Sequence, residues 1–93
     1  MPKPNRRDQG GSSDRRSLAS PDGVVTFTLK RTSRGVHVER LERTRIESNV
    51  AHSALFPDRA SFDRFCDTDQ QRFNYALLYK EIRRAFDELL DAP

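Results

Sequence analysis

The sequence predicts an α+β fold in which a three-stranded antiparallel sheet (β-β-β) is packed by two C-terminal helices, with a disordered N-terminal tail. Residues 24–31 alternate apolar and polar side chains with a period of two, and the pattern resumes after a turn, which indicates strands. Residues 74–90 repeat apolar side chains three and four positions apart, which indicates an amphipathic helix. A sheet with one apolar face and helices with one apolar stripe bury both by packing in two layers.

The N-terminal segment, residues 1–22, is expected to be a disordered basic tail, and residues 23–93 are expected to form a single small α+β domain. The one large aliphatic side chain of the tail, Leu18, stands among Pro, Gly, Ser, Asn, Asp and Arg. Such a segment cannot bury enough apolar surface to offset the entropy that it loses on ordering. It also has no apolar run after its positive charges, so it lacks the pattern of a secretory signal.

The compartment is predicted from the cysteine content and from the lack of long apolar runs. One cysteine in the chain excludes an internal disulfide framework and suits a reducing compartment. No stretch has the length and apolar composition of a membrane span. We therefore expect a cytoplasmic protein that does not act at a membrane.

A β-hairpin is predicted with strands at Val24–Lys30 and Val36–Arg43. The sequence Thr-Ser-Arg-Gly at residues 32–35 lies between them and supplies turn chemistry, because its glycine can adopt a positive φ. In the second strand the two valines share a face, but Leu41 has the opposite parity. Either a bulge shifts the register after Glu39, or Leu41 faces outward.

A third strand and a short helix are predicted next. Residues 50–56 form the strand, although their pattern also fits a helix, and Pro57 ends either element. Asp58 then opens a helix as its N-cap, and the apolar side chains that follow fall at helical spacing. The run Asp-Thr-Asp at residues 67–69 is expected to end this helix. The inner face of the third strand would carry Val50, His52, Ala54 and Phe56.

The last helix is predicted from about Asn74 to Leu90. Its apolar side chains form one stripe, which would face the sheet. Three acids near its C-terminus oppose the helix dipole, and a partner cation would explain their placement. The stripe consists of Tyr75, Leu78, Tyr79, Ile82, Phe86 and Leu89, and the acids are Asp87, Glu88 and Asp91.

The segment SFDRFCDTDQQRFNYALLYKEIRRAFDELL, residues 61–90, resembles the C-terminal part of small uncharacterised proteobacterial proteins. In those proteins a short aromatic helix, an acidic turn, an Arg-Phe pair and a helix rich in Tyr and Leu follow one another. The resemblance covers about a third of the chain, includes no catalytic motif and implies no activity. It rests on Phe62, Phe65, Asp69, Arg72, Phe73, Tyr75, Leu78 and Tyr79.

The predicted hairpin is basic, with six cations and two acids in residues 30–45. Arginine binds phosphate through two parallel hydrogen bonds, and a two-stranded ribbon fits the major groove of duplex DNA. The same charges are also typical of a solvated hairpin whose edges resist aggregation. The candidate residues for binding a polyanion are Lys30, Arg31, Arg34, Arg40, Arg43 and Arg45.

The aromatic run at the start of the last helix is a candidate protein interface. Phe73, Tyr75 and Tyr79 lie within it, and a small three-stranded sheet covers only part of so large an apolar surface. Either these side chains form the core, or a protein partner or a second copy of the chain covers them.

Catalytic and metal-binding sites are not predicted. Cys66 is separated by long stretches from His37 and His52, and it falls on an apolar helix face, where a cysteine usually packs as a small hydrophobe. The two histidines and the cysteine have none of the short spacings of metal ligands. We therefore expect a non-enzymatic protein-interaction module, homodimeric or with another partner, that acts through the aromatic helix face or a sheet edge, without a cofactor or a small-molecule substrate. The alternative function is an accessory nucleic-acid-binding protein that uses the basic hairpin.

Overall fold

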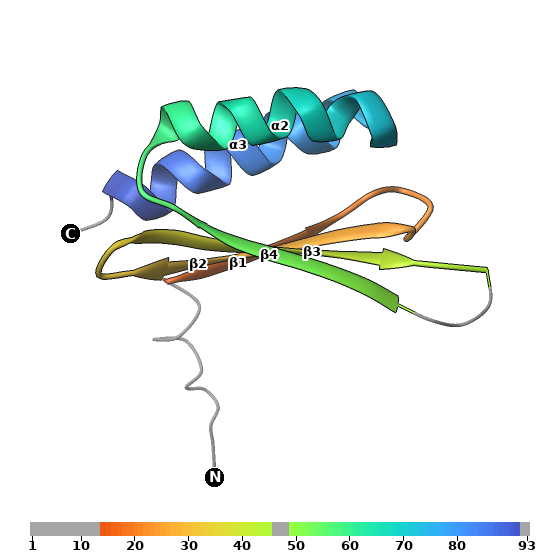
Figure 1. The fold of residues 1–93 in the computed structure, drawn as a ribbon, viewed down its shortest axis with the longest axis horizontal. Helices are drawn as coiled ribbons and strands as arrows, with labels where there is room; N and C mark the ends of the chain where they lie inside the picture. Colours follow the sequence, from red (N-terminus) through yellow and green to blue (C-terminus); the bar gives the residue numbers. More distant parts are fainter. Residues whose placement is uncertain (1–13, 46–48, 92–93) are drawn as a thin grey trace, which may run out of the picture.

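The computed structural model describes residues 14–45 and 49–91, which form one antiparallel sheet covered on one face by two helices (Figure 1). The sheet has four strands in the order β1-β2-β3-β4, and α3 lies over β1 and β2 while α2 lies closer to β4. The elements are β1 (Arg15–Ala19), β2 (Val25–Thr32), β3 (Gly35–Arg43), β4 (Asn49–Phe56), α2 (Arg59–Phe73) and α3 (Ala76–Asp91). The α+β class and both helices are thus as predicted, but the sheet has a fourth strand.

The additional strand, β1, lies in the segment that was expected to be a disordered tail. Its backbone pairs with β2, and Leu18 stands opposite Phe27 and packs against the core. One aliphatic side chain is enough here because the neighbouring strand already supplies an apolar face and half of the backbone hydrogen bonds. The prediction of disorder is therefore wrong for residues 15–19, and residues 1–13 lie outside the described part of the chain.

The hairpin of β2 and β3 forms where it was predicted. Thr32 pairs with Gly35 across a two-residue turn, and the register continues without a bulge to the pair of Val25 with Glu42. Leu41 consequently faces outward, on the open side of the sheet. Gly35 adopts a φ of 141°, and a Cβ atom there would lie 2.8 Å from the Cα atom of Pro57, so the close approach of the next loop requires glycine.

The first helix begins as predicted and ends later than predicted. The Asp58 side chain accepts a hydrogen bond of 2.8 Å from the backbone N–H of Ser61, which caps α2. The helix then runs through residues 67–69 to Phe73, so the expected break is wrong. Asp69 does not terminate the helix because its carboxylate lies on the core side, where it binds Arg40 and the hydroxyl of Tyr79.

The core lies between the sheet and the helices and is rich in aromatic side chains. The rings of Phe62 and Phe86 stack with their centroids 4.4 Å apart, and the ring of Phe27 meets Tyr79 edge-on at 5.7 Å. Among the residues described, no helix has the length and apolar character needed to cross a membrane. The buried apolar residues are Val25, Phe27, Leu29, Val36, Val38, Phe62, Cys66, Phe73, Leu78, Tyr79, Ile82, Ala85, Phe86 and Leu89.

Candidate functional site

The strongest candidate site is the outer edge of β4, and its character follows from the hydrogen bonds between the strands. The N–H of Arg43 donates to the carbonyl of Val24 at 2.8 Å, so these residues form a hydrogen-bonded pair between β3 and the start of β2. Antiparallel pairs alternate between bonded and non-bonded, so the odd-numbered residues of β3 bond to β2 and the even-numbered ones bond to β4. Arg40 and Val38 therefore bond to β4, where their partners are even-numbered.

The odd-numbered residues of β4 consequently direct their backbone groups away from the sheet. Ala51, Ser53 and Leu55 turn both N–H and C=O toward the free edge, and no described strand lies beyond β4. Eight residues make this edge long for a small domain, and none of them is charged. Val50 and Leu55 add apolar surface, since they are 48% and 40% exposed.

The opposite edge of the sheet, β1, is built differently. It has five residues, two of which are arginines, and α3 packs over it. Arg16 also reaches Glu88 of α3, with 3.6 Å between the guanidinium nitrogen and the carboxylate oxygen. Short length, charge and a covering helix are the means by which proteins protect edge strands from pairing. Because β4 is neither short nor charged, we regard its edge as the one open to another strand.

A cleft of about 370 Å³ lies between α2 and the helix-facing side of β3 and β4. The imidazole of His52 stacks on the ring of Phe65 at one wall, with 6.0 Å between the centroids. The polar groups of the cleft are mostly hydrogen-bond donors. The cleft is lined by Arg40, His52, Phe65, Thr68, Asp69 and Arg72.

The floor of this cleft is a buried ionic network. The Arg40 guanidinium binds the carboxylate of Asp69, and the Tyr79 hydroxyl donates to the other oxygen of that carboxylate at 2.6 Å. Burial, together with this hydrogen bond, raises the pKa of the Tyr79 hydroxyl. The Nε–H of Arg40 is buried and has no hydrogen-bond partner among the described residues. The guanidinium also lies over the ring of Phe73, 4.9 Å from its centroid.

The side of α2 that borders the cleft carries an exposed cation, Arg72. At 100° per residue, Arg72 lies about 20° from Phe65 around the helix axis, Asp69 lies about 40° away on the core side, and Arg64 lies about 100° away toward solvent. The acids of α2 other than Asp69 point toward α3, where Asp63 binds Arg83 at 3.0 Å. Arg72 is 66% exposed at its side chain and lies 3.4 Å from the carboxylate of Glu42.

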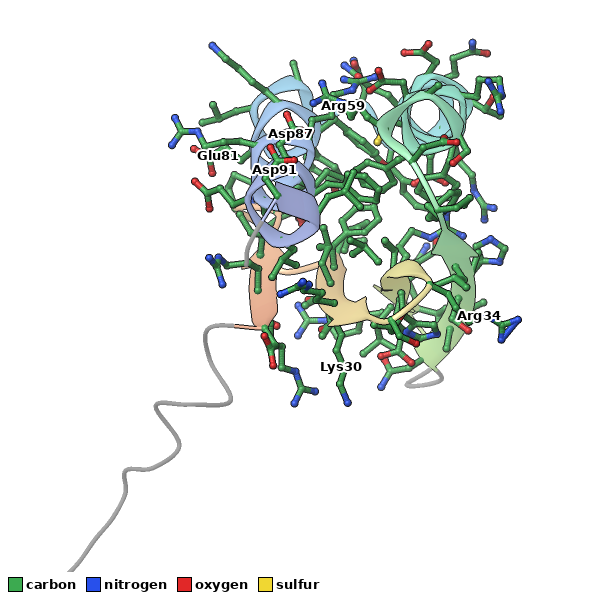
Figure 2. All side chains as sticks on the ribbon, turned by 90° about the vertical axis from the view of Figure 1, so that its left-hand side faces the viewer. Lys30, Arg34, Arg59, Glu81, Asp87 and Asp91 are labelled. Atoms are coloured by element: carbon green, nitrogen blue, oxygen red, sulfur yellow. The ribbon has the colours of Figure 1, made fainter. Side chains whose placement is uncertain are left out.

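The six cations that were predicted to bind a polyanion do not form one patch. Lys30, Arg31 and Arg34 lie near the hairpin turn, and Figure 2 shows Lys30 on the side of the sheet away from the helices. Arg43 and Arg45 lie at the other end of β3, six residues and roughly 20 Å along the strand from the partner of Lys30.

The prediction that Arg40 binds a polyanion is wrong, because this side chain is buried and paired with Asp69 inside the protein. Arg15, which was expected in the disordered basic tail, stands directly opposite Lys30 on the open face. The only sequence signal for that position was its basic charge, within a segment that was expected to be disordered.

The predicted aromatic interface belongs to the interior. Tyr79 is fully buried and Phe73 is 9% exposed, so neither side chain is available to a partner. The hydroxyl of Tyr75 donates to the carboxylate of Asp22 at 2.8 Å, which ties α3 to the β1–β2 turn and raises the pKa of the tyrosine. The added strand and the length of α2 supply the cover that a three-stranded sheet could not.

The remaining candidate groups are the thiol of Cys66, possible metal ligands and the acids at the end of α3. Burial raises the pKa of the Cys66 thiol to about 12, so the thiol stays protonated at neutral pH. In the described ranges, no three His, Cys, Asp or Glu side chains are placed to hold a metal ion. Two of the three acids at the end of α3 have partners within the described residues, since Asp87 binds Arg59 of α2 (Figure 2) and Glu88 lies near Arg16.

Comparison with protein-family models, with curated proteins and with solved structures found no match to this chain. The resemblance of residues 61–90 to small uncharacterised proteobacterial proteins therefore stays a prediction.

Proposed function

We propose that this chain is a small non-enzymatic protein-interaction module that binds an extended segment of a partner as an added strand along β4. The observation that carries the proposal is the uncharged eight-residue edge, whose outward N–H and C=O groups belong to Ala51, Ser53 and Leu55. In this mode of recognition main-chain hydrogen bonds supply the affinity, and pockets for alternate side chains supply the specificity. An edge strand that lacks charge, proline and a bulge favours such pairing.

The test is a selection of random dodecapeptides, displayed on phage, against the immobilised full chain. Selected peptides are synthesised and titrated by fluorescence anisotropy. Hydrogen exchange then shows where each peptide binds, because an added strand protects the amides of Ala51, Ser53 and Leu55. Failure to select any peptide, or protection confined to other amides, would contradict the proposal.

The two edges provide matched variants for this test. Ser53→Pro removes an outward N–H from β4 without removing a hydrogen bond to β3. Ser17→Pro makes the same change on β1, where the pair of Ser20 with Val25 places the bonded residues at even numbers. We expect Ser53→Pro to weaken peptide binding about tenfold or more, because the peptide loses one hydrogen bond and the adjacent hydrogen bonds are displaced. We expect Ser17→Pro to change peptide binding by less than about twofold. Equal effects of the two prolines would count against the edge of β4.

Self-association is measured in the same set of proteins by sedimentation equilibrium. A wild-type dimer that Ser53→Pro dissociates would mean that the added strand is β4 of a second copy. A monomer that still binds peptides would mean that the partner is another protein.

A second candidate function, nucleic-acid binding, is favoured by one row of side chains. Arg15, Lys30 and His37 stand directly opposite one another on three adjacent strands of the open face. Arg15 and Lys30 are like charges in opposite positions, which destabilise a sheet, and a bound phosphate would offset that repulsion. The test is anisotropy against random-sequence duplex, single-stranded DNA and RNA over a series of salt concentrations, with Lys30→Glu as the variant. Absence of binding at low salt would eliminate this candidate.

A further inference from the structure

We infer that the segment bound at β4 carries an acidic side chain, whose carboxylate enters the cleft between α2 and β4. This inference rests on the proposed function. It adds the chemistry of the partner, namely an extended segment with a glutamate or aspartate at a position that faces the helices.

The register of an added strand brings its side chains to the cleft. Because Ala51 and Ser53 would form the hydrogen-bonded pairs, the partner residue opposite His52 faces the same side of the sheet as that imidazole. Directly opposite residues have Cβ atoms roughly 5 Å apart. His52 lines the cleft, so a side chain opposite it points along the wall formed by α2.

The polar groups around that position have donors to spare. The Nε–H of Arg40 lies in the floor without a partner among the described residues, and the Arg40 side chain is 9% exposed. Arg72 lies at the rim with a side chain that is 66% exposed, and one of its nitrogens is 3.4 Å from the Glu42 carboxylate. Thr68 adds a hydroxyl to the lining. The one carboxylate in the lining, Asp69, already binds Arg40 and Tyr79. A carboxylate satisfies such donors, whereas a lysine or arginine of the partner would face two guanidinium groups.

The composition of β4 also distinguishes an acidic partner from a second copy. The β4 strand contains no acid, so a second β4 cannot supply the carboxylate. In a symmetric antiparallel pair of β4 strands the two α2 helices flank the axis on the same side of the sheet. That arrangement would leave the cleft of each copy facing an uncharged strand, so Arg40 and Arg72 would gain no carboxylate partner.

The experiment uses peptides selected on the full chain and synthesised with amidated C-termini, so that a carboxylate has to come from a side chain. Each acidic position is replaced by its amide, and both peptide forms are titrated against the wild type and Arg72→Gln. Arg72 is exposed, so this variant is expected to fold. Arg84→Gln, an exposed arginine on α3, gives the same change in net charge away from the cleft.

We expect one acidic position to contribute about tenfold or more to affinity in the wild type, and that contribution to fall to less than about threefold in Arg72→Gln while Arg84→Gln retains it. Peptides that bind at β4 without an acidic residue, or whose acid contributes equally in all three proteins, would overturn this inference and leave the proposed function standing. Selection of no peptide at all would overturn both, and a β4-mediated dimer of the wild type would retain the edge as the site and overturn the acidic partner.

Discussion

Removing Arg40 from its buried pair should destabilise the protein severely, and the structure allows the size of that effect to be worked out. The side chains of Arg40 and Asp69 are 9% and 8% exposed, so solvent screens their interaction little. Arg40→Met leaves the Asp69 carboxylate buried with the Tyr79 hydroxyl as its remaining hydrogen-bond donor. Breaking a buried pair from one side typically costs about 3–5 kcal/mol. A domain of this size has a free energy of unfolding of about 4–11 kcal/mol, so the variant retains a fraction of its stability or unfolds.

The informative comparison is with the variant in which the whole network is apolar. Arg40→Met, Asp69→Leu and Tyr79→Phe together remove every buried polar group of the network, and such replacements are often neutral or stabilising. Urea denaturation followed by far-UV circular dichroism should show the triple variant to be more stable than Arg40→Met alone by about 2 kcal/mol or more. A cost below about 1 kcal/mol for Arg40→Met, or a triple variant as unstable as the sum of its single changes, would refute the argument that the charges are coupled in the interior.

Three further predictions concern single positions. Gly35→Ala should lower the free energy of unfolding by about 2 kcal/mol or more, because an L-residue is strained at a φ of 141°; a loss under about 0.5 kcal/mol in urea denaturation would contradict the backbone geometry. At pH 8 Cys66 should react with an aromatic disulfide reagent only as fast as the protein unfolds, because burial keeps it a thiol; rapid labelling of the native state would show the site to be open. The pKa of Asp22 is held below its ordinary value of 3.8 by hydrogen bonds from Ser20 and then from Tyr75, so this carboxylate contributes stability above pH 3.8 that is lost as the pH falls through its folded pKa. Tyr75→Phe should raise that pKa toward 3.8 in an NMR titration, and an unchanged value would mean that the hydroxyl does not bond to Asp22 in solution.

The parts of the fold that the sequence predicts well depend on local chemistry. Alternation and a turn with a glycine placed β2 and β3 within two residues of their observed bounds. The cap at Asp58 follows from a short polar side chain that can reach a backbone N–H three residues on. Each of these features is determined by residues that are close in the sequence, so it can be predicted from the sequence alone.

The parts that were missed depend on partners far along the chain. The strand β1 is stable because it pairs with β2. The composition of residues 1–22 does not indicate that this pairing occurs. Asp69 looks like a helix breaker until Arg40, 29 residues away, is placed next to it. Arg40 in turn looks like a surface cation until the same contact is known. One non-local ion pair therefore accounts for an error in the helix boundary and an error in the candidate polyanion site.

The fourth strand also changes which charges protect the sheet, and this bears directly on the proposed function. In a three-stranded sheet β2 would be an edge, and Lys30 would be one of its protecting cations. With β1 in place β2 is internal, and the protected edge is the one with Arg15 and Arg16. The other edge, β4, has no such protection in either arrangement. Pairing with a partner strand would remove the exposed backbone groups and stabilise the folded chain by about 2.7 kcal/mol at a hundredfold excess of ligand over Kd. The same edge that is a hazard in isolation is thus a source of stability in a complex, which is the thermodynamic behaviour expected of a strand-addition module.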